Sequence, residues 1–303
     1  MRRVLVTGAT GKIGSQLVPR LAAYPDIAVR AFARNAEKAA PLMASGAELA
    51  AGALEDRSAV RAAMDGIDTL VLITAASPLA AGQASAALGA AVEAGVRKVV
   101  RISVFKAAVD GPTDVTRQHG RSDAAIQASG LTYIILRPPF FMQNLCLMAG
   151  PSVARNGKLY FGTGEGKLAM IDLRDIVDCA EQSVVSDAHD NQVFTLTGPE
   201  SISFHAIADR LTEILGCPVQ YVPVPPEAVQ QSIRAMGMGE WYAQVMRDLC
   251  RAYREGWGDL TTDSVARVSG HSPRSFDEFA RQIFVPLLRP EGDLSSSPAG
   301  STR

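Results

Sequence analysis

The amino-acid sequence predicts an α/β fold, a doubly wound parallel sheet with a smaller C-terminal lobe. The first half of the chain alternates short apolar runs with longer amphipathic stretches, the order expected of parallel strands joined by crossover helices. Several runs, such as Val4–Val6 and Thr69–Thr74, contain Val, Leu and Ile with little polar alternation. Such runs are typical of strands that are buried on both faces.

The first half is expected to contain six strands and five helices. The strands are predicted at Arg3–Thr7, Ala28–Ala33, Ala47–Ala51, Thr69–Thr74, Lys98–Ser103 and Thr132–Leu136. The helices are predicted at Ile13–Tyr24, Ala36–Ser45, Arg57–Met64, Gln83–Ala94 and Arg117–Ser129.

After Pro138 the pattern becomes irregular. It predicts a strand and turn over Val193–Ser203, a helix over Phe204–Leu215, a strand and proline-rich connection over 217–228, and helical segments that carry Trp241 and end near Leu288. We therefore expect a sheet domain at 1–150, to which segments near 165–200 return. A smaller lobe at 201–290 would lie over the open edge of the sheet. The small polar residues of 291–303 predict a disordered tail.

A glycine-rich stretch, TGATGKIG (Thr7–Gly14), separates the first expected strand from the first expected helix. Glycines at this spacing allow a tight turn, close approach of a ligand to the backbone, and close packing of the helix against its strand. The free N–H groups of the helix N-terminus suit a pyrophosphate. No Ser or Thr follows Lys12, so a Walker-type loop is excluded. The stretch predicts a Rossmann-like dinucleotide site, with a glycine-rich turn of any α/β protein as the alternative.

The residue after the second expected strand favours NADP(H). An acidic residue there usually bonds the ribose hydroxyls of NAD. This chain has Arg34, with Lys38 one helical turn further on. A guanidinium attracts a 2′-phosphate and can pair with it bidentately, whereas a carboxylate would repel it. The alternative is a solvated loop arginine.

Composition excludes several other functions. Thirty basic and 31 acidic residues leave a net charge of −1, so nothing drives binding to nucleic acid or to an acidic membrane. No apolar run is long enough to span a bilayer. The four cysteines lack metal-ligand spacing and are expected to be buried free thiols, with no metal site. The start has no secretory apolar segment, so we expect a cytoplasmic protein.

Several stretches resemble the NmrA-like branch of the atypical short-chain dehydrogenases/reductases, in order along nearly the whole chain. The matching stretches are TGATGKIG, FARNAEK, GALEDRSAVRAAMDGIDTLVLIT, SGLTYIILRPPFFMQN, IDLRDIVDCA, LTGPESISFHAIA and VSGHSPRSFDEFA. The family includes NADPH quinone reductases, triphenylmethane dye reductases, isoflavone-type reductases and redox-sensing regulators without enzyme activity. The resemblance therefore implies the fold more firmly than the reaction.

The resemblance also implies roles for single residues. The phosphate loop would consist of Gly8, Thr10, Gly11, Lys12, Ile13 and Gly14, and Arg34 would meet the 2′-phosphate. Thr74 and Ala75 would run beside the cofactor. Ser103 and the stretch Pro138–Phe141, including Phe140, would frame the nicotinamide. The family often has Gly-Asp near the adenine, where this chain has Gly52-Ala53, so an adenine contact there is open.

The acid of ordinary short-chain dehydrogenases is missing. None of the six tyrosines is followed by lysine four residues later. His119 is the nearest titratable candidate, and a histidine occurs at this place in the dye and quinone reductases. It could orient the nicotinamide ribose or donate a proton, with Asp123 holding the imidazole from the same helix face. The alternative is a helix-surface histidine without a role.

Two further features of the candidate site have plain alternatives. Ser103 could offer a hydroxyl, although small polar residues are common at strand ends. Phe140, Phe141, Met142 and Trp241 could line an apolar pocket, or they could belong to the core.

These features predict an NADPH-dependent reductase of an electron-poor small molecule. Hydride delivered to a simple ketone leaves a basic alkoxide that needs a proton donor. A quinone, enone, iminium ion or cationic dye leaves a weakly basic or neutral product and needs mainly positioning. The alternative is a non-catalytic redox sensor that binds NAD(P)(H) and acts through a protein partner. The sequence leaves the substrate, the partner and the oligomeric state open, a homodimer included.

Overall fold

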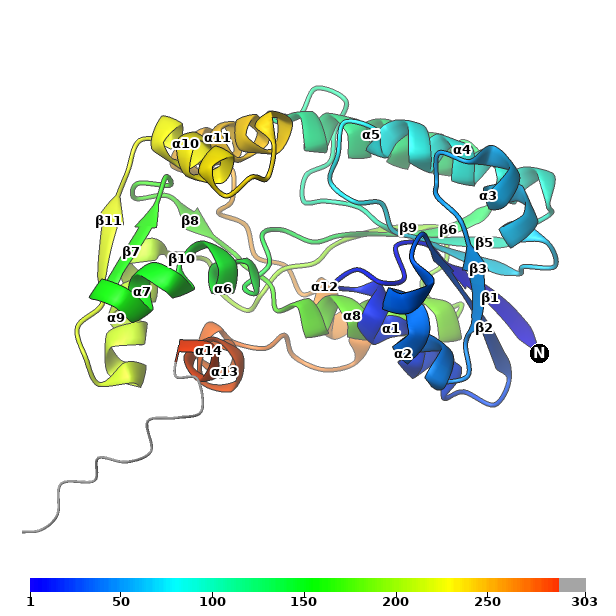
Figure 1. Ribbon diagram of the computed structural model, residues 1–303, viewed down its shortest axis with the longest axis horizontal. Coiled ribbons are helices and arrows are strands. Elements are labelled where there is room, and N and C mark those ends of the chain that lie inside the picture. Colours follow the sequence, from blue (N-terminus) through cyan, green and yellow to red (C-terminus); the bar gives the residue numbers. More distant parts are fainter. Residues whose placement is uncertain (289–303) are drawn as a thin grey trace, which may run out of the picture.

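The computed structural model describes residues 1–288 of the chain, so the tail predicted at 291–303 lies outside the described residues. Seven parallel strands form one sheet flanked by helices, a Rossmann-like arrangement, with a second group of smaller elements beside it (Figure 1). In spatial order the strands are β3 (Glu48–Ala51), β2 (Ile27–Ala33), β1 (Arg2–Val6), β4 (Thr69–Leu72), β5 (Lys98–Ile102), β6 (Thr132–Arg137) and β9 (Gln192–Thr195).

The strand order reverses at β1, and this reversal creates the place for a ligand. Val4 lies opposite Val29 of β2 on one side and Thr69 of β4 on the other. The chain proceeds outward from β1 in one direction through β2 and β3, and in the other through β4, β5, β6 and β9. The connections leaving β1 and β4 therefore diverge, which opens a crevice at their carboxyl ends.

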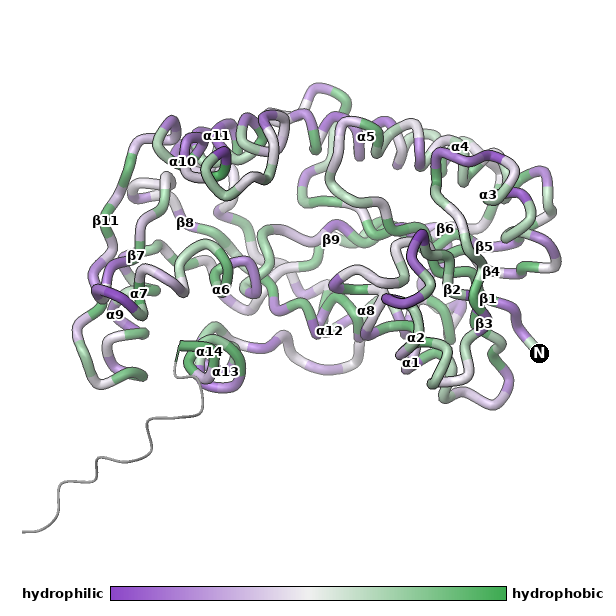
Figure 2. Tube along the Cα trace, viewed as in Figure 1, coloured by the Kyte–Doolittle hydropathy of each residue, from purple (hydrophilic) through white to green (hydrophobic). Residues whose placement is uncertain are grey.

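Helices cover both faces of the sheet (Figure 1). One face carries α1 (Gly14–Ala22), α2 (Ala36–Ala44), α8 (Leu173–Val185) and α12 (Ser264–Ser269). The other face carries α3 (Arg57–Met64), α4 (Ala80–Glu93) and α5 (Asp114–Gln127). The inner strands are largely hydrophobic, while the covering helices mix hydrophobic and hydrophilic residues (Figure 2).

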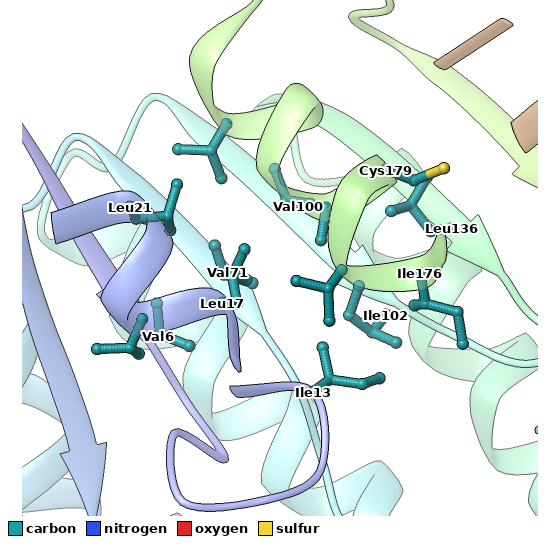
Figure 3. Close-up of a cluster of buried hydrophobic side chains, with 14 of the residues drawn as sticks. Val6, Ile13, Leu17, Leu21, Val71, Val100, Ile102, Leu136, Ile176 and Cys179 are labelled. Carbon is teal, nitrogen blue, oxygen red and sulfur yellow. The ribbon is translucent and has the colours of Figure 1, made fainter. Parts of the chain in front are cut away.

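The core between the sheet and α1/α8 shows why the strands lack polar alternation. Val71, Val100 and Leu136 project from neighbouring strands, and Leu17 and Ile176 meet them from the two helices (Figure 3). The alternate strand residues pack against the helices of the opposite face. Each strand therefore needs apolar residues at successive positions.

A second apolar core belongs to the elements beside the sheet. These elements are α6 (Asn144–Met148), α7 (Gly150–Asn156), β7 (Lys158–Phe161), β8 (Lys167–Leu168), β10 (Ile202–Ser203), α9 (Phe204–Leu215), β11 (Gln220–Pro223), α10 (Pro226–Ala235), α11 (Glu240–Arg254), α13 (Phe276–Phe279), the π-helical turn η1 (Ala280–Phe284) and α14 (Val285–Leu288). β7 pairs with β11 and β8 with β10, so segments far apart in the chain close this group on itself.

Most expected elements lie within a few residues of their predicted positions, and the differences have local causes. Helix α5 begins at Asp114 rather than Arg117, because Thr113 and Thr116 form a reciprocal capping box. The predicted proline-rich connection is partly wrong. Pro226 is the first residue of α10, where its missing N–H costs nothing. The strands β7 and β8 were not predicted.

The structure bears on two expectations drawn from composition, which concern the burial of the cysteines and membrane-spanning segments. Cys179 and Cys250 are buried free thiols, whereas Cys217 is exposed and Cys146 half-buried, so the prediction of four buried thiols was wrong for these two. Among residues 1–288, no helix has the length and apolar character needed to cross a membrane.

Replacing Gly120 with alanine is expected to destabilise the fold by roughly 1–3 kcal/mol. A Cβ at Gly120, on the buried side of α5, would lie 2.3 Å from the carbonyl carbon of Ala108, so α5 or its neighbouring loop must shift. Gly89 of α4 is the matched control, because a Cβ there meets nothing within 4 Å. Gly89→Ala should leave stability unchanged or raise it by up to about 1 kcal/mol. Urea denaturation of both variants makes the comparison, and equal stabilities would contradict the tight packing of α5.

Candidate functional site

A cavity of about 780 Å³ opens at the carboxyl ends of β1, β2, β4 and β5, where the strand order reverses. Its size is that of a typical cofactor or ligand site. Tyr242 of α11 and Asn144 of α6 complete its wall, so the second core contributes to the same cavity. Of the predicted site residues, Gly8, Thr10, Gly11, Lys12, Ile13, Arg34, Thr74, Ala75, Ser103, His119 and Phe141 line it.

The glycine-rich loop is held at the end of β1 by close backbone contacts. The buried Thr7 hydroxyl donates to the Ile73 carbonyl at 2.9 Å and accepts from the Ile73 amide at 2.8 Å. Gly8 has a φ of +60°, in the region that favours glycine. A Cβ at Gly14 would lie 2.4 Å from the Gly8 carbonyl oxygen. Gly14 therefore allows the start of α1 to pack closely against the Gly8 backbone, and it does not itself line the cavity.

The opposite side of the loop faces open space. A Cβ at Gly11 would meet only the Gly8 carbonyl oxygen, at 3.2 Å. No side chain caps the N-terminus of α1. The Ser15 and Gln16 amides donate to the Gly11 and Ile13 carbonyls, so the Gly14 N–H and the positive end of the helix dipole are what this terminus offers to an anion. Lys12 reaches across the cavity, and its ammonium donates to Asn144 Oδ1 at 3.0 Å.

Within residues 1–288, the adenosine end of the predicted site has a cation without a bonded partner. Arg34 follows β2, lines the cavity and has no bonded partner among the described residues. Lys38 is exposed on α2 and does not line the cavity. Glu55 also lines this end, and its pKa is lowered by hydrogen bonds to its own backbone and to Gln83, with a smaller effect from Arg34.

The sequence left open whether an adenine would contact Ala53. Ala53 does not line the cavity, but Gly52 and Leu54 on either side of it do, together with Phe32 of β2. The side chains of Phe32 and Leu54 provide apolar surface where a base could lie. The motif position Gly52-Ala53 did not point to either residue.

The stretch from Pro138 to Met142 divides its side chains between two environments. Pro139 and Phe141 line the cavity, whereas Phe140 and Met142 are buried in the second core. Phe141 forms a parallel β-bridge with Ile171, and at such a position the side chains on either side point away from that of Phe141, which explains the division. The expected contacts of Pro138 and Phe140 with the cavity are therefore not observed.

The four residues that could line an apolar pocket or belong to the core are divided between the two, and Phe141 alone of them lines the cavity. Trp241 does not line the cavity, and its indole N–H donates to Asp114 at 2.8 Å. The next residue, Tyr242, lines the cavity instead. Burial raises the pKa of the Tyr242 phenol, which keeps it protonated at neutral pH.

A buried polar network lies beneath the nicotinamide end of the predicted site. Ser103 donates to Asp123 Oδ2 at 2.8 Å, and Arg137 Nε donates to the same oxygen at 2.9 Å. Beside this pair, the Arg101 guanidinium lies 3.2 Å from His119 Nδ1. Because the hydroxyl proton of Ser103 is committed to Asp123, Ser103 can only accept a hydrogen bond from the cavity.

Two expectations about His119 are therefore wrong. His119 is 5% exposed, so it is not a helix-surface residue. Arg101, not Asp123, contacts its imidazole. Residues two apart on β5 face the same side, as do residues four apart on α5. Arg101 and Ser103 consequently oppose His119 and Asp123 as two separate pairs: Arg101 contacts Nδ1 of His119, and Ser103 bonds Oδ2 of Asp123.

The pKa values of this network follow from burial. Burial raises the pKa of the Asp123 carboxyl, against the opposing effect of Arg137. Burial and the positive charges of Arg101 and Arg137 hold the pKa of His119 well below its usual range. His119 is therefore neutral at physiological pH, and the imidazolium form that a general acid would need is disfavoured.

Ion pairs on α8, beside the sheet, need no catalytic role. Asp172 pairs with Arg174, and Arg274 bonds both Asp175 and Asp178. His271 also bonds Asp178, so the carboxylates of this cluster are already satisfied by protein groups.

Comparisons with known proteins agree with this geometry. A family model described as NAD(P)H-binding matches residues 8–160. An NAD(P)H azoreductase from Xenophilus azovorans is 36% identical over 278 residues, covering 92% of this chain and 96% of the relative. Quinone oxidoreductase 2 from Escherichia coli is 24% identical over 283 residues, covering 93% of this chain and 98% of the relative.

Two solved structures share the fold. The NADPH complex of an NADPH-dependent quinone oxidoreductase from Escherichia coli has a TM-score of 0.82 at 24% identity, covering 91% of this chain and 97% of that one. The NADP(H) complex of the Citrobacter sp. triphenylmethane reductase has a TM-score of 0.84 at 23% identity, covering 92% and 99%.

Proposed function

Because the chain belongs to the NAD(P)H-binding family, of the NmrA-like type of atypical short-chain dehydrogenases/reductases, we propose that it is an NADPH-dependent reductase of electron-poor aromatic acceptors such as quinones, azo compounds or cationic dyes. The observation that carries the proposal is one continuous cavity with a glycine loop and a free arginine at one end. At its other end this cavity has an apolar wall without a strong acid.

The residues of the cavity fit the dinucleotide. The backbone at Gly11 and the uncapped start of α1 would bind the pyrophosphate. Arg34 would pair with the 2′-phosphate, and Phe32 and Leu54 would contact the adenine. When bound, the reduced dinucleotide supplies a hydride to the acceptor.

The opposite end would hold the reduced ring and the acceptor. Thr74, Ala75, Pro139 and Phe141 line this part, which gives an apolar surface suited to a flat ring. Ser103 presents an acceptor oxygen there, which suits an amide N–H of the nicotinamide.

The available proton donors restrict the acceptor. His119 is neutral, Ser103 is committed to Asp123, and burial makes the Tyr242 phenol a weaker acid than usual. An alkoxide formed from a simple ketone would therefore lack a ready proton source. Acceptors whose reduced form is weakly basic or neutral avoid this requirement.

NADPH oxidation with a panel of quinones, azo dyes, triphenylmethane cations and simple ketones tests the proposal. We expect turnover with the quinones and the triphenylmethane cations and none with the ketones. The azo dyes, whose hydride adduct is a basic nitrogen anion, test whether the site can also supply a proton. NADPH carrying deuterium on one face of the ring should transfer the label to the central carbon of a triphenylmethane cation. Tight NADPH binding without turnover on any acceptor would refute the reductase and favour a redox sensor that acts through a protein partner.

A further inference from the structure

Arg101 is a charged residue in the interior of the central sheet. It lies in the fourth position of β5 and is 0% exposed. Burying a guanidinium is costly unless hydrogen bonds replace its hydration. Its bonds go to the Leu72 carbonyl at 3.2 Å, to Thr74 Oγ1 at 3.1 Å and to His119 Nδ1 at 3.2 Å. Two of these partners, Thr74 and His119, line the cavity.

The contact with His119 determines where the imidazole proton lies. A guanidinium has hydrogen-bond donors and no acceptor, so Nδ1 of His119 must accept. A neutral imidazole that accepts at Nδ1 carries its proton on Nε2. Burial lowers the pKa of Arg101 to about 10, which leaves the guanidinium charged at neutral pH.

The second ring nitrogen is left for a ligand. Nε2 has no bonded partner among residues 1–288, although the His119 side chain is almost completely buried and lines the cavity. The neighbouring polar group, Ser103, offers only an acceptor. His119 therefore supplies an N–H donor beside an oxygen acceptor at the same end of the cavity.

We propose that Arg101 is a positioning residue that fixes His119 as the neutral Nε2–H tautomer, so that His119 donates a hydrogen bond to the acceptor atom that becomes negatively charged. This inference rests on the proposed reductase function and specifies how the same site stabilises the charge that forms when a quinone is reduced. The hydride and its electron pair move from the reduced dinucleotide to the quinone, which is reduced. The negative charge falls on a quinone oxygen, which the Nε2–H group stabilises until water supplies the proton. His119 keeps its own proton throughout.

The charged and titratable groups around His119 support a fixed tautomer. Arg101 faces it from β5, Arg137 acts on it from β6, and the Tyr242 phenol of α11 lines the same cavity. The carboxylate of Asp123, on α5 itself, is bonded to Ser103 and Arg137. Within residues 1–288, no carboxylate forms an ion pair with His119 that would favour the imidazolium.

Nitrogen-15 NMR of histidine-labelled protein tests the tautomer without any turnover. The chain has four histidines, and the spectrum of His119→Gln assigns the His119 signals by their loss. We expect a protonated Nε2 and an unprotonated Nδ1 from pH 5 to pH 8, in the free protein and with NADP⁺ bound. A proton on Nδ1, or titration near pH 6.5, would overturn the proposal. Arg101→Met, which removes the donor at similar length, should allow a proton on Nδ1 to appear, while burial and Arg137 keep the imidazole neutral in this range.

Kinetics with two acceptors test the donor role. His119→Leu should lower kcat with a quinone about tenfold, the loss of one hydrogen bond to a developing charge. The same variant should reduce a triphenylmethane cation within about twofold of the wild-type rate, because that product is neutral and offers no charge to stabilise. His119→Gln retains an N–H donor and should recover most of the quinone rate.

The outcomes separate the two proposals. Equal losses on quinone and cation would indicate a structural role for His119 and would overturn the donor role. No loss on either acceptor would overturn it as well. If the wild-type protein bound NADPH but reduced nothing, the proposed function would fail, while the NMR result would still decide the tautomer. Should Arg101→Met not fold, the wild-type NMR spectrum and the His119 variants decide the proposal without it.

Discussion

Replacing Gly11 with valine is expected to weaken NADPH binding by about 100-fold or more, a loss of at least ~2.7 kcal/mol, while the protein remains folded. The side of Gly11 that a Cβ would occupy is open apart from the Gly8 carbonyl oxygen at 3.2 Å, so the fold tolerates the change. The same space is where a pyrophosphate would approach the backbone. Titration of NADPH fluorescence measures the affinity, and circular dichroism reports the fold.

Two variants control this experiment. Gly11→Ala adds a single carbon and should produce a smaller loss of affinity. Gly89→Val places the same side chain on α4, where nothing lies within 4 Å of the new Cβ, and should leave NADPH binding unchanged. A folded Gly11→Val protein with normal NADPH affinity would show that the pyrophosphate does not lie on this loop.

Replacing Arg34 with glutamate is expected to abolish or invert the preference for NADPH over NADH. A charge-assisted bidentate pair contributes roughly 1.5–3 kcal/mol, or one to two decades in affinity, and a carboxylate would in addition repel the 2′-phosphate. Arg34 lines the cavity and forms no hydrogen bond or ion pair within the described part of the chain, although its charge contributes to the lowered pKa of Glu55. The ratio of dissociation constants for the two cofactors measures the effect.

Lys38→Glu is the matched control, since it makes the same charge change one helical turn away and outside the cavity. It should change the ratio by less than about threefold, because exposed charges at this distance are screened by salt. If Lys38→Glu shifted the ratio as much as Arg34→Glu, the preference for NADPH would come from the summed positive charge at this end of the cavity and not from a direct bond to Arg34. Equal affinities for NADPH and NADH in the unmodified protein would remove the basis of both predictions.

Sequence patterns within short segments were sufficient to predict the strands of the central sheet. The apolar runs around Val71 and Val100 identified strands buried on both faces, and the spacing of Gly8, Gly11 and Gly14 located the loop. These features are encoded within a few residues of one another, so they are visible in the sequence. The short strands β7 and β8, whose partners β11 and β10 lie far away in the chain, were not predicted.

The candidate site was predicted less completely, and the errors have a common cause. Phe140, Phe141, Met142 and Trp241 were considered together for their apolar character. Phe141 lines the cavity, whereas Phe140 and Met142 are buried in the second core and Tyr242 lines the cavity in place of Trp241. Composition cannot distinguish a residue that faces a cavity from its neighbour that faces the core. Alternation along the extended stretch was the available signal.

By itself, the sequence determined the α/β class, the glycine loop at the end of β1 and the position of Arg34 after β2, because each depends on contacts within one strand–loop–helix unit. Only the tertiary structure decided which groups surround His119. Arg101, Ser103 and Arg137 come from two neighbouring strands and meet α5 across the sheet. Their pairing depends on strand register and helix docking, and no spacing within a single segment encodes it. The same packing sets the burial that keeps His119 neutral, since desolvation acts through the whole surrounding shell of protein.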